Sequence, residues 1–205
     1  FVARTYRAMT GASCSGGASP FTDVDPSSYA VDAIDCIYGL GITTGTSSTT
    51  YSPNEYVTRE QVAAFVARTY RAMTGASCSG GATPFTDVDP GSYAAGDIGC
   101  LYGLGVVNGT SGTTYSPDEF VTREQAAALL ARLYRLVTDP SCSGGATPFI
   151  DVAPSSYAAG DVGCLHGLGV VKGTSGTTYS PSEYATRKQV AALLGRIWMA
   201  PAIIS

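Results

Sequence analysis

Apolar residues recur at helical spacing behind a short polar stretch in the first half of the chain. The stretch begins at Thr58 and ends at Gln61, and a Thr followed three residues later by Gln is the capping box that opens a helix. The apolar series behind it comprises Val62, Val66, Thr69, Tyr70 and Met73. This pattern predicts a helix from Arg59 to about Met73. Arg59 would occupy the first helical position, away from the buried face and free to meet a group outside.

A second apolar series lies earlier and predicts a shorter helix. Its members are Tyr29, Ala33, Ile34, Ile37 and Leu40. Asp25 followed by Pro26 favours a helix start, with the proline at the first helical position. Gly41 followed by Ile42 is typical of a left-handed C-terminal cap with its apolar contact. We therefore expect a first helix of about three turns that begins near Pro26.

The segment between the two predicted helices, residues 43–53, is built from Gly, Ser and Thr, with Tyr51 as its one large residue. Such side chains bond to their own backbone and favour turns. We expect positive φ at Gly45 and at its equivalents Gly109 and Gly173. Each unit then reads as a short extended piece, a helix, a glycine turn, a long loop and a second helix.

This unit repeats every 64 residues, as the capping threonines at 58, 122 and 186 show. We place the boundaries at 21–84, 85–148 and 149–205, after a segment 1–20 that would be the end of a preceding repeat plus a linker. Residues 1–17 match residues 65–81 one for one, and the chain has no initiating Met. We interpret it as a fragment or processed form of a longer protein. A single repeat is too small to bury a core of its own, so the repeats should pack together into one mainly α fold.

Charge narrows the classes of partner. The net charge is −4 with a pI near 4.8, and Arg outnumbers Lys, which occurs only at Lys172 and Lys188. This balance excludes the basic footprint of a nucleic-acid-binding protein and a polybasic patch for anionic lipid. No apolar run approaches the length needed to cross a bilayer, so we expect no membrane insertion. The Gly-, Ser- and Thr-rich composition suits an exported surface protein.

Six cysteines share the repeat, in pairs 22 residues apart. Fifteen connectivities are formally open, and the exact repetition favours a bridge within each copy. The predicted pairs are Cys14–Cys36, Cys78–Cys100 and Cys142–Cys164. The alternative is thiolate ligation of zinc, but the close Cys-x-x-Cys spacing of such sites does not occur, and we expect neither metal nor cofactor. Disulfides imply an oxidising compartment, and each loop would contribute roughly 3 kcal/mol by the chain-entropy model.

The motifs together resemble the S-layer homology (SLH) repeat of bacterial surface proteins. They are FTDV, then Tyr and the first helix, then Gly-x-x-x-Gly, then YSP and TREQ, in the same order three times, with FIDV and TRKQ in the last copy. The resemblance implies helix pairs in a pseudo-threefold arrangement, with a central bundle made of one helix from each repeat. In that family the grooves between repeats bind secondary cell-wall polysaccharide, often carrying pyruvate ketals. Such binding tethers S-layer proteins and surface enzymes to the cell wall.

The family's ligand residues map onto three sets of positions. The arginine set is Arg59, Arg123 and Arg187; the aspartate set is Asp23, Asp87 and Asp151; the aromatic set, normally Trp, is Tyr29, Tyr93 and Tyr157. A guanidinium can bind a carboxylate through two parallel hydrogen bonds, and an aromatic face can lie against sugar C–H groups. The chain departs from the family in having Tyr for Trp, in having cysteines, and in Lys188, which replaces the helix-opening Glu and opposes the helix dipole.

Each set also has an ordinary structural explanation. The arginines could be solvated or locally salt-bridged at their helix starts, the aspartates could cap turns, and the tyrosines could be core aromatics. Whether the arginine forks face an open groove or are satisfied within the protein separates two functions. The first is wall anchoring through bound polysaccharide; the alternative is a self-assembling structural subunit of an extracellular layer or filament.

Catalysis is not predicted. The single His166 has no counterpart in the other copies, so a triad cannot form three times, and Lys188 interrupts the series of glutamates that paired carboxylates would need. We expect a non-enzymatic, extracellular module of the bacterial cell surface or S-layer.

Overall fold

The computed structural model describes residues 17–200 and shows six helices and no strand within that range. In chain order they are α2 (Val31–Gly39), α3 (Arg59–Thr74), α4 (Ala95–Gly103), α5 (Arg123–Val137), α6 (Ala159–Gly167) and α7 (Arg187–Met199). Short and long helices thus alternate, as the repeat predicted. None of the helices in this range is both long and apolar enough to pass through a bilayer.

The long helices begin where the capping boxes predicted. Thr58 Oγ1 accepts from the Gln61 amide and Gln61 Oε1 accepts from the Thr58 amide, at 3.4 and 3.3 Å. The second copy repeats both bonds, while the third retains the bond from the Thr186 amide to Gln189 Oε1 at 2.9 Å. α3 ends one residue beyond the predicted end, at Thr74, where Gly75 turns the chain with φ 70°.

The short helices begin later than predicted. Asp25 does not cap a helix: its Oδ1 accepts from the amide and the hydroxyl of Ser27, which closes a local turn. α2 therefore starts at Val31 rather than near Pro26, and it has nine residues. The predicted C-terminal cap is confirmed, because Gly41 has φ 68° and the amides of Gly41 and Ile42 donate to the carbonyls of Tyr38 and Ile37.

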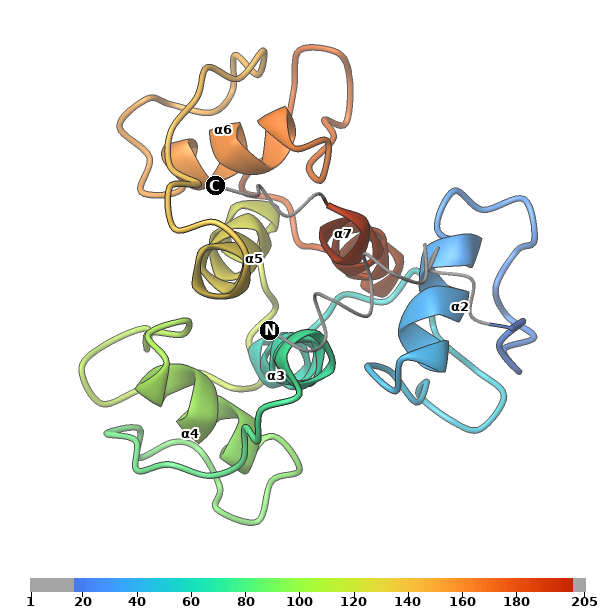
Figure 1. Cartoon of the computed structure of the whole chain (residues 1–205), viewed down its shortest axis with the longest axis vertical. Coiled ribbons are helices and arrows are strands. Elements are labelled where there is room, and N and C mark those ends of the chain that lie inside the picture. The colour runs from blue at the N-terminus through green and yellow to red at the C-terminus, as the bar shows by residue number, and fades with distance from the viewer. Residues whose placement is uncertain (1–16, 201–205) are drawn as a thin grey trace.

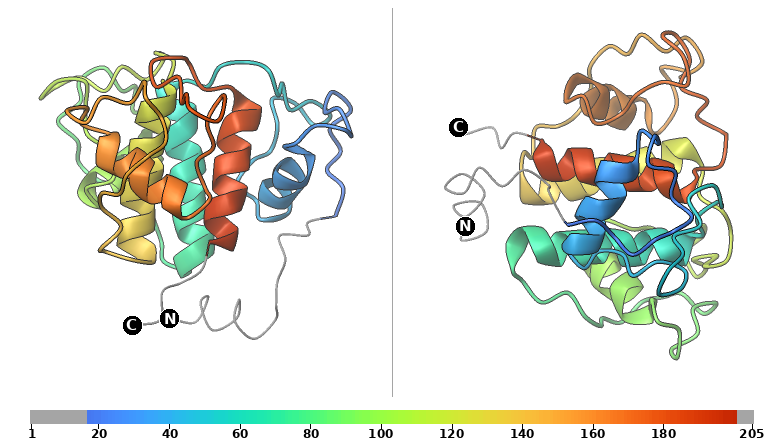
Figure 2. Two further views of the ribbon diagram at one scale, coloured as in Figure 1. Left: turned by 90° about the horizontal axis from the view of Figure 1, so that it is seen from above. Right: turned by 90° about the vertical axis from the view of Figure 1, so that its right-hand side faces the viewer.

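The three long helices form a central bundle, and the three short helices lie around it, across the bundle direction (Figures 1 and 2). Each short helix packs against the long helix of the preceding repeat: α4 against α3, and α6 against α5. α2 completes the ring by packing against α7. The pseudo-threefold arrangement is therefore confirmed, and each outer contact joins two consecutive repeats.

Short extended segments fasten the three repeats to one another around the pseudo-threefold axis. The Val57 amide donates to the Ala185 carbonyl, the Ala185 amide to the Val121 carbonyl, and the Val121 amide to the Val57 carbonyl, at 2.8–3.1 Å. The residues immediately before these three are aromatic, and their ring centroids lie 5.6 Å apart in every pair: Tyr56, Phe120 and Tyr184. Each repeat therefore relies on another repeat to satisfy one of its backbone amides.

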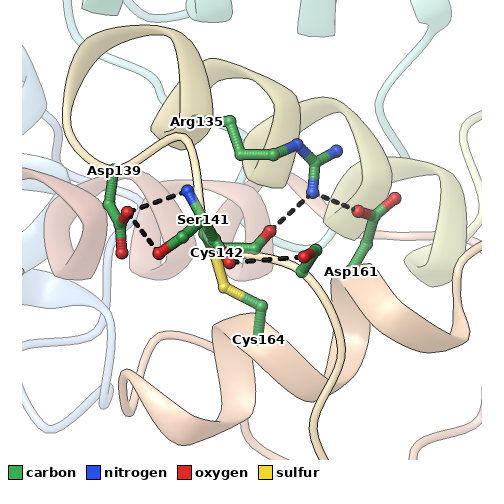
Figure 3. The surroundings of a disulfide bond; sticks show 7 residues. Arg135, Asp139, Ser141, Cys142, Asp161 and Cys164 are labelled. Carbon is green, nitrogen blue, oxygen red and sulfur yellow. Dashed lines mark hydrogen bonds and ion pairs between the residues drawn. A yellow bond between two sulfur atoms is a disulfide. The ribbon is translucent and has the colours of Figure 1, made fainter.

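Two of the predicted disulfides are confirmed, Cys78–Cys100 and Cys142–Cys164, with Cα–Cα distances of 5.4 and 5.5 Å. The third, Cys14–Cys36, involves Cys14, which lies outside the described residues. Each bridge ties the linker that follows a long helix to the next short helix, as Figure 3 shows for the pair Cys142 and Cys164. Beside it, Arg135 Nη1 donates to the Cys142 carbonyl and pairs with Asp161.

Candidate functional site

The aspartates of the predicted set are exposed, and each organises a loop through both of its carboxylate oxygens. Asp23 Oδ1 accepts from the Tyr51 amide at 2.8 Å, and Asp23 Oδ2 accepts from the Ser52 amide at 2.7 Å. Asp87 and Asp151 make the same pair of bonds in their own copies. Desolvation alone would raise the pKa of these last two carboxyl groups, but the amide hydrogen bonds outweigh it and lower the pKa below its usual value. The aspartates therefore act as turn caps.

The turn that each aspartate caps was not predicted to be strained. Ser52, Ser116 and Ser180 all have φ 57°, in the left-handed region that non-glycine residues seldom adopt. Two bonds to one carboxylate hold the serine there and direct the preceding tyrosine inward, where Tyr51 is fully buried. Among the glycines expected to have positive φ, Gly45 has φ 81°, whereas Gly109 and Gly173 lie outside the left-handed region.

The arginine set reaches into the neighbouring repeat. Arg187 Nε donates to the Tyr51 carbonyl at 2.7 Å, the Tyr51 hydroxyl donates to the Arg187 carbonyl at 3.1 Å, and the guanidinium carbon lies 4.7 Å from the ring centroid. Arg59 on Tyr115 and Arg123 on Tyr179 repeat this latch. The expectation that the arginines stay away from the buried face is wrong, because Arg59 and Arg187 are only 9% and 3% exposed.

The latch does not use every guanidinium nitrogen. Arg59 Nη2 donates to the Asn108 carbonyl and Arg123 Nη2 to the Lys172 carbonyl, at 3.3 and 3.2 Å. Within residues 17–200, no group accepts from Nη1 of Arg123. Arg123 is also half-buried rather than buried, so one of its nitrogens is available to an outside acceptor.

A second arginine set lines the same region and was missed from the sequence. Arg68, Arg132 and Arg196 project from the long helices, and their Nη1 atoms donate to the carbonyls of Ile42, Val106 and Val170 at 3.0–3.2 Å. Burial lowers the pKa of Arg196, although the nearby Tyr29 opposes this effect. Each of these arginines recurs nine residues after the first arginine of its helix, and this spacing could have identified the set. The sequence alone did not show that both arginines face one groove.

The aromatic set lies at the surface rather than in the core. Tyr29, Tyr93 and Tyr157 are 61%, 59% and 62% exposed, and each precedes its short helix instead of joining it. Partial burial raises the pKa of all three phenols, to about 12 for Tyr93, where the carboxylate of Glu60 adds to the effect.

The two arginine sets and the exposed tyrosines meet in grooves, each of which draws on three consecutive repeats around the ring, whereas no aspartate of the predicted set is among the residues that line the two grooves described below. We name each groove by its first arginine. The Arg123 groove has a volume of about 360 Å³, and its walls include Arg123, Lys172, Arg196 and Tyr29. The Arg187 groove has a volume of about 300 Å³, and its walls include Arg187, Arg68, Thr44 and Tyr93. The pseudo-symmetry assigns Arg59, Arg132, Asn108 and Tyr157 to the Arg59 groove.

The chemistry of these walls suits binding. Each groove offers two guanidinium groups, an exposed phenol ring and loop hydroxyl groups, which together can hold an acidic, hydroxyl-rich ligand. Within residues 17–200 there is no cluster of three His, Cys, Asp or Glu side chains placed to hold a metal ion.

Comparison with known proteins gives the same repeat pattern. The S-layer homology domain family matches residues 20–63, 84–127 and 148–191. An endoglucanase of Bacillus sp. (strain KSM-635) is 30% identical over 88% of the chain, and an amylopullulanase of Thermoanaerobacterium thermosulfurigenes is 31% identical over 85%. An S-layer protein of Bacillus thuringiensis subsp. finitimus is 25% identical over 92% of the chain.

The chain spans only part of each of these relatives: 19% of the endoglucanase, 9% of the amylopullulanase and 23% of the S-layer protein. The enzymes thus share with this chain a small region that an S-layer protein also carries. SLH domains are non-catalytic modules that anchor surface proteins, and their location is the extracellular surface of the bacterial cell. With three matches that cover well over half of its length, this chain belongs to the S-layer homology domain family.

Proposed function

We propose that the ring anchors a surface protein by binding secondary cell-wall polysaccharide in the grooves between its repeats. The observation that carries this proposal is the recurrence of one groove at Arg123 and at Arg187, with the equivalent residues at Arg59, in which two guanidinium groups lie beside a tyrosine that is about three-fifths exposed. An aromatic face against a sugar ring and a guanidinium against a carboxylate are complementary contacts for an acidic glycan.

In this proposal the residues have different tasks. The exposed tyrosines and the outward nitrogens of Arg123 and Arg196 touch the glycan. The aspartates act indirectly: Asp151 fixes the Tyr179 turn, and the Tyr179 carbonyl fixes Arg123. Asp23 and Asp87 are assigned the same positioning role in the other two grooves.

Calorimetric titration with purified, non-peptidoglycan wall polysaccharide tests the proposal. The informative variant is Tyr29→Ala, Tyr93→Ala and Tyr157→Ala together, because these side chains are exposed and their removal should leave the fold intact. Replacing the first arginine set by alanine would break the latches between repeats and confound binding with unfolding. We expect saturable binding by the native chain and a loss of at least about tenfold in affinity for the variant.

A matched control removes the three aromatic rings on the pseudo-threefold axis, Tyr56, Phe120 and Tyr184, which are 45–49% exposed and belong to no groove wall described above. This variant should bind the polysaccharide like the native chain. Absence of heat with the native chain, or equal affinity for the native chain and the groove variant, would exclude glycan binding at these tyrosines.

The same axial rings favour a second candidate function, self-assembly into an extracellular layer or filament. Their side-by-side exposure at one end of the axis offers an apolar patch that a second copy could cover. Sedimentation velocity over a concentration series separates the two functions. Assembly that disappears in the axial variant, from a native chain that binds no polysaccharide, would support the structural role over the anchor.

A further inference from the structure

The three grooves are built from equivalent positions of the repeats but differ in charge. Lys172 lies in the wall of the Arg123 groove, on the loop whose carbonyl accepts from Arg123. The equivalent loop position is Asn108 in the Arg59 groove and Thr44 in the Arg187 groove. The Arg123 groove therefore has three cationic side chains in its wall, where each of the others has two.

A second difference falls on the same groove. Glu60 accepts from the Ser92 hydroxyl at 2.9 Å, which places its carboxylate beside Tyr93 of the Arg187 groove. Glu124 accepts from the Ser156 hydroxyl at 3.1 Å, next to Tyr157 of the Arg59 groove. These carboxylates offset part of the positive charge of the two grooves.

Among residues 17–200, no carboxylate takes the equivalent place in the Arg123 groove. Lys188 occupies the helix position of the two glutamates, and its ammonium donates to Asn54 Oδ1 at 2.7 Å. The charges that act on the Tyr29 phenol are those of Arg196 and Arg123, both positive. Counting wall cations and the neighbouring carboxylate, the Arg123 groove carries a formal charge of +3 and each of the others +1.

The solvent exposure of the first arginine also distinguishes the Arg123 groove from the Arg187 groove. In the Arg187 groove the guanidinium contacts two rings, 4.7 Å from the Tyr51 centroid and 5.5 Å from the Phe65 centroid, and the residue is 3% exposed. In the Arg123 groove the position of Phe65 is taken by the smaller Leu193, and Arg123 is half-buried. The groove with the most positive charge is thus also the one whose first arginine is open to solvent.

We propose that the Arg123 groove is the primary anion site of the ring, and that it takes a glycan segment carrying more than one carboxylate or phosphate group. The other two grooves bind such a segment more weakly. This inference rests on the proposed glycan-binding function and adds to it the class of ligand and the order in which the grooves fill. The attraction between opposite charges at the rim of a site contributes to specificity, and this attraction weakens as salt is added.

Chemical-shift titration of the isotope-labelled full chain resolves the grooves, because the amides of Gly45, Gly109 and Gly173 each report on one of them. The probes are trigalacturonate for carboxylate, a sugar phosphate for phosphate, and neutral cellotriose. We expect Gly173 to reach half-saturation at roughly a tenfold lower concentration of an anionic probe than Gly45 and Gly109, with the difference shrinking as salt is added. The two anionic arms identify which acidic group is preferred, and cellotriose should show no preference among the grooves.

The chain supplies its own matched variants. Lys172→Asn with Lys188→Glu gives the Arg123 groove the residues of the Arg59 groove. In this variant Gly173 should no longer reach half-saturation at a lower probe concentration than Gly45 and Gly109. The reciprocal Asn108→Lys with Glu124→Lys should transfer a comparable gain to Gly109. Lys172 and Asn108 are exposed, Lys188 and Glu124 are half-buried, and none of the four belongs to the buried core, so both variants should fold.

The outcomes separate this inference from the proposed function. Equal half-saturation at all three glycines, or a lead of Gly173 that persists in the Lys172→Asn and Lys188→Glu variant, would overturn the inference while wall polysaccharide still binds. A chain that binds wall polysaccharide but responds to neither anionic probe would do the same. Failure to bind the polysaccharide at all would remove the proposed function, and the inference with it.

Discussion

The ion pair beside each described disulfide gives a quantitative test of how consecutive repeats are joined. Arg135 Nη1 lies 2.7 Å from Asp161 Oδ1 and donates to the Cys142 carbonyl at 2.8 Å (Figure 3). The two side chains are 27% and 12% exposed, so water screens the pair only in part. A partly buried hydrogen bond between charged groups contributes about 1.5–3 kcal/mol, and we expect Asp161→Ala to lower the free energy of unfolding by about 2 kcal/mol. For a domain of this size, that corresponds to a fall in Tm of about 4–8 °C.

The ring itself suggests the compensating variant. Where α7 meets α2, the positions equivalent to Arg135 and Asp161 are Met199 and Ala33, with no charge on either. Arg135→Met with Asp161→Ala copies that contact and leaves no unpaired guanidinium behind. In urea unfolding of the oxidised chain, the double variant should be more stable than the sum of the single effects predicts, by about 1–2 kcal/mol. Additive effects, with a coupling below about 0.5 kcal/mol, would refute the view that the pair stabilises the contact between α5 and α6.

Three further predictions concern the loops and bridges. A Cβ at Gly109 would collide with the backbone carbonyls of Ser111 and Thr114, so Gly109→Ala should lower Tm by several degrees. Gly112→Ala should not lower Tm, because the space around a Cβ at Gly112 is open. Thermal melts of the two variants test this, and equal Tm values would contradict the packing argument. The folded-state pKa of Asp87 is lowered, so its contribution to stability is complete above the unfolded pKa of about 3.9 and is lost as pH falls through the folded value. Asp87→Asn should therefore lower Tm near neutral pH, and the difference from the native chain should shrink as the pH is lowered below the unfolded pKa. A pH-independent difference would count against this assignment. Removing the Cys78 bridge by Cys78→Ser with Cys100→Ser should reduce the free energy of unfolding by roughly 3 kcal/mol in denaturant titrations, and an unchanged midpoint would show that the bridge does not restrict the unfolded chain.

Features of the fold that depend only on residues close together in the sequence could be predicted. The start of α3 follows from the reciprocal bonds between Thr58 and Gln61, which need no tertiary partner. The end of α2 follows from Gly41 for the same reason. Its start was misplaced because Asp25 has two local options, and a turn closed onto Ser27 competes with a helix cap.

The contacts that build the grooves depend on residues far apart in the sequence. Arg187 meets Tyr51 across 136 positions, and no local pattern distinguishes that latch from a solvated helix start. The resemblance to the family predicted that this arginine lies in a groove, but it gave no sign that the residue is buried. The second arginine in each groove was missed because its neighbours become visible only when the ring closes and brings Arg196 beside Tyr29.

The closing contact between α7 and α2 explains why the order of the helices around the ring is specific. A Cβ at Gly195 would lie 3.0 Å from the Ala33 Cβ, so this glycine permits a close approach of the two helices where α3 and α5 carry alanine, Ala67 and Ala131. Met199 and Ala33 replace the ion pair of the other contacts at the same time. If α2 packed on α3 or α5 instead, an arginine would face Ala33 without its carboxylate partner, and alanine would stand where the close approach requires glycine. Each of these differences fits the contact between α2 and α7 and would be unfavourable if α2 packed on α3 or α5. Side-chain complementarity therefore selects α7 as the partner of α2 and closes the ring after three repeats.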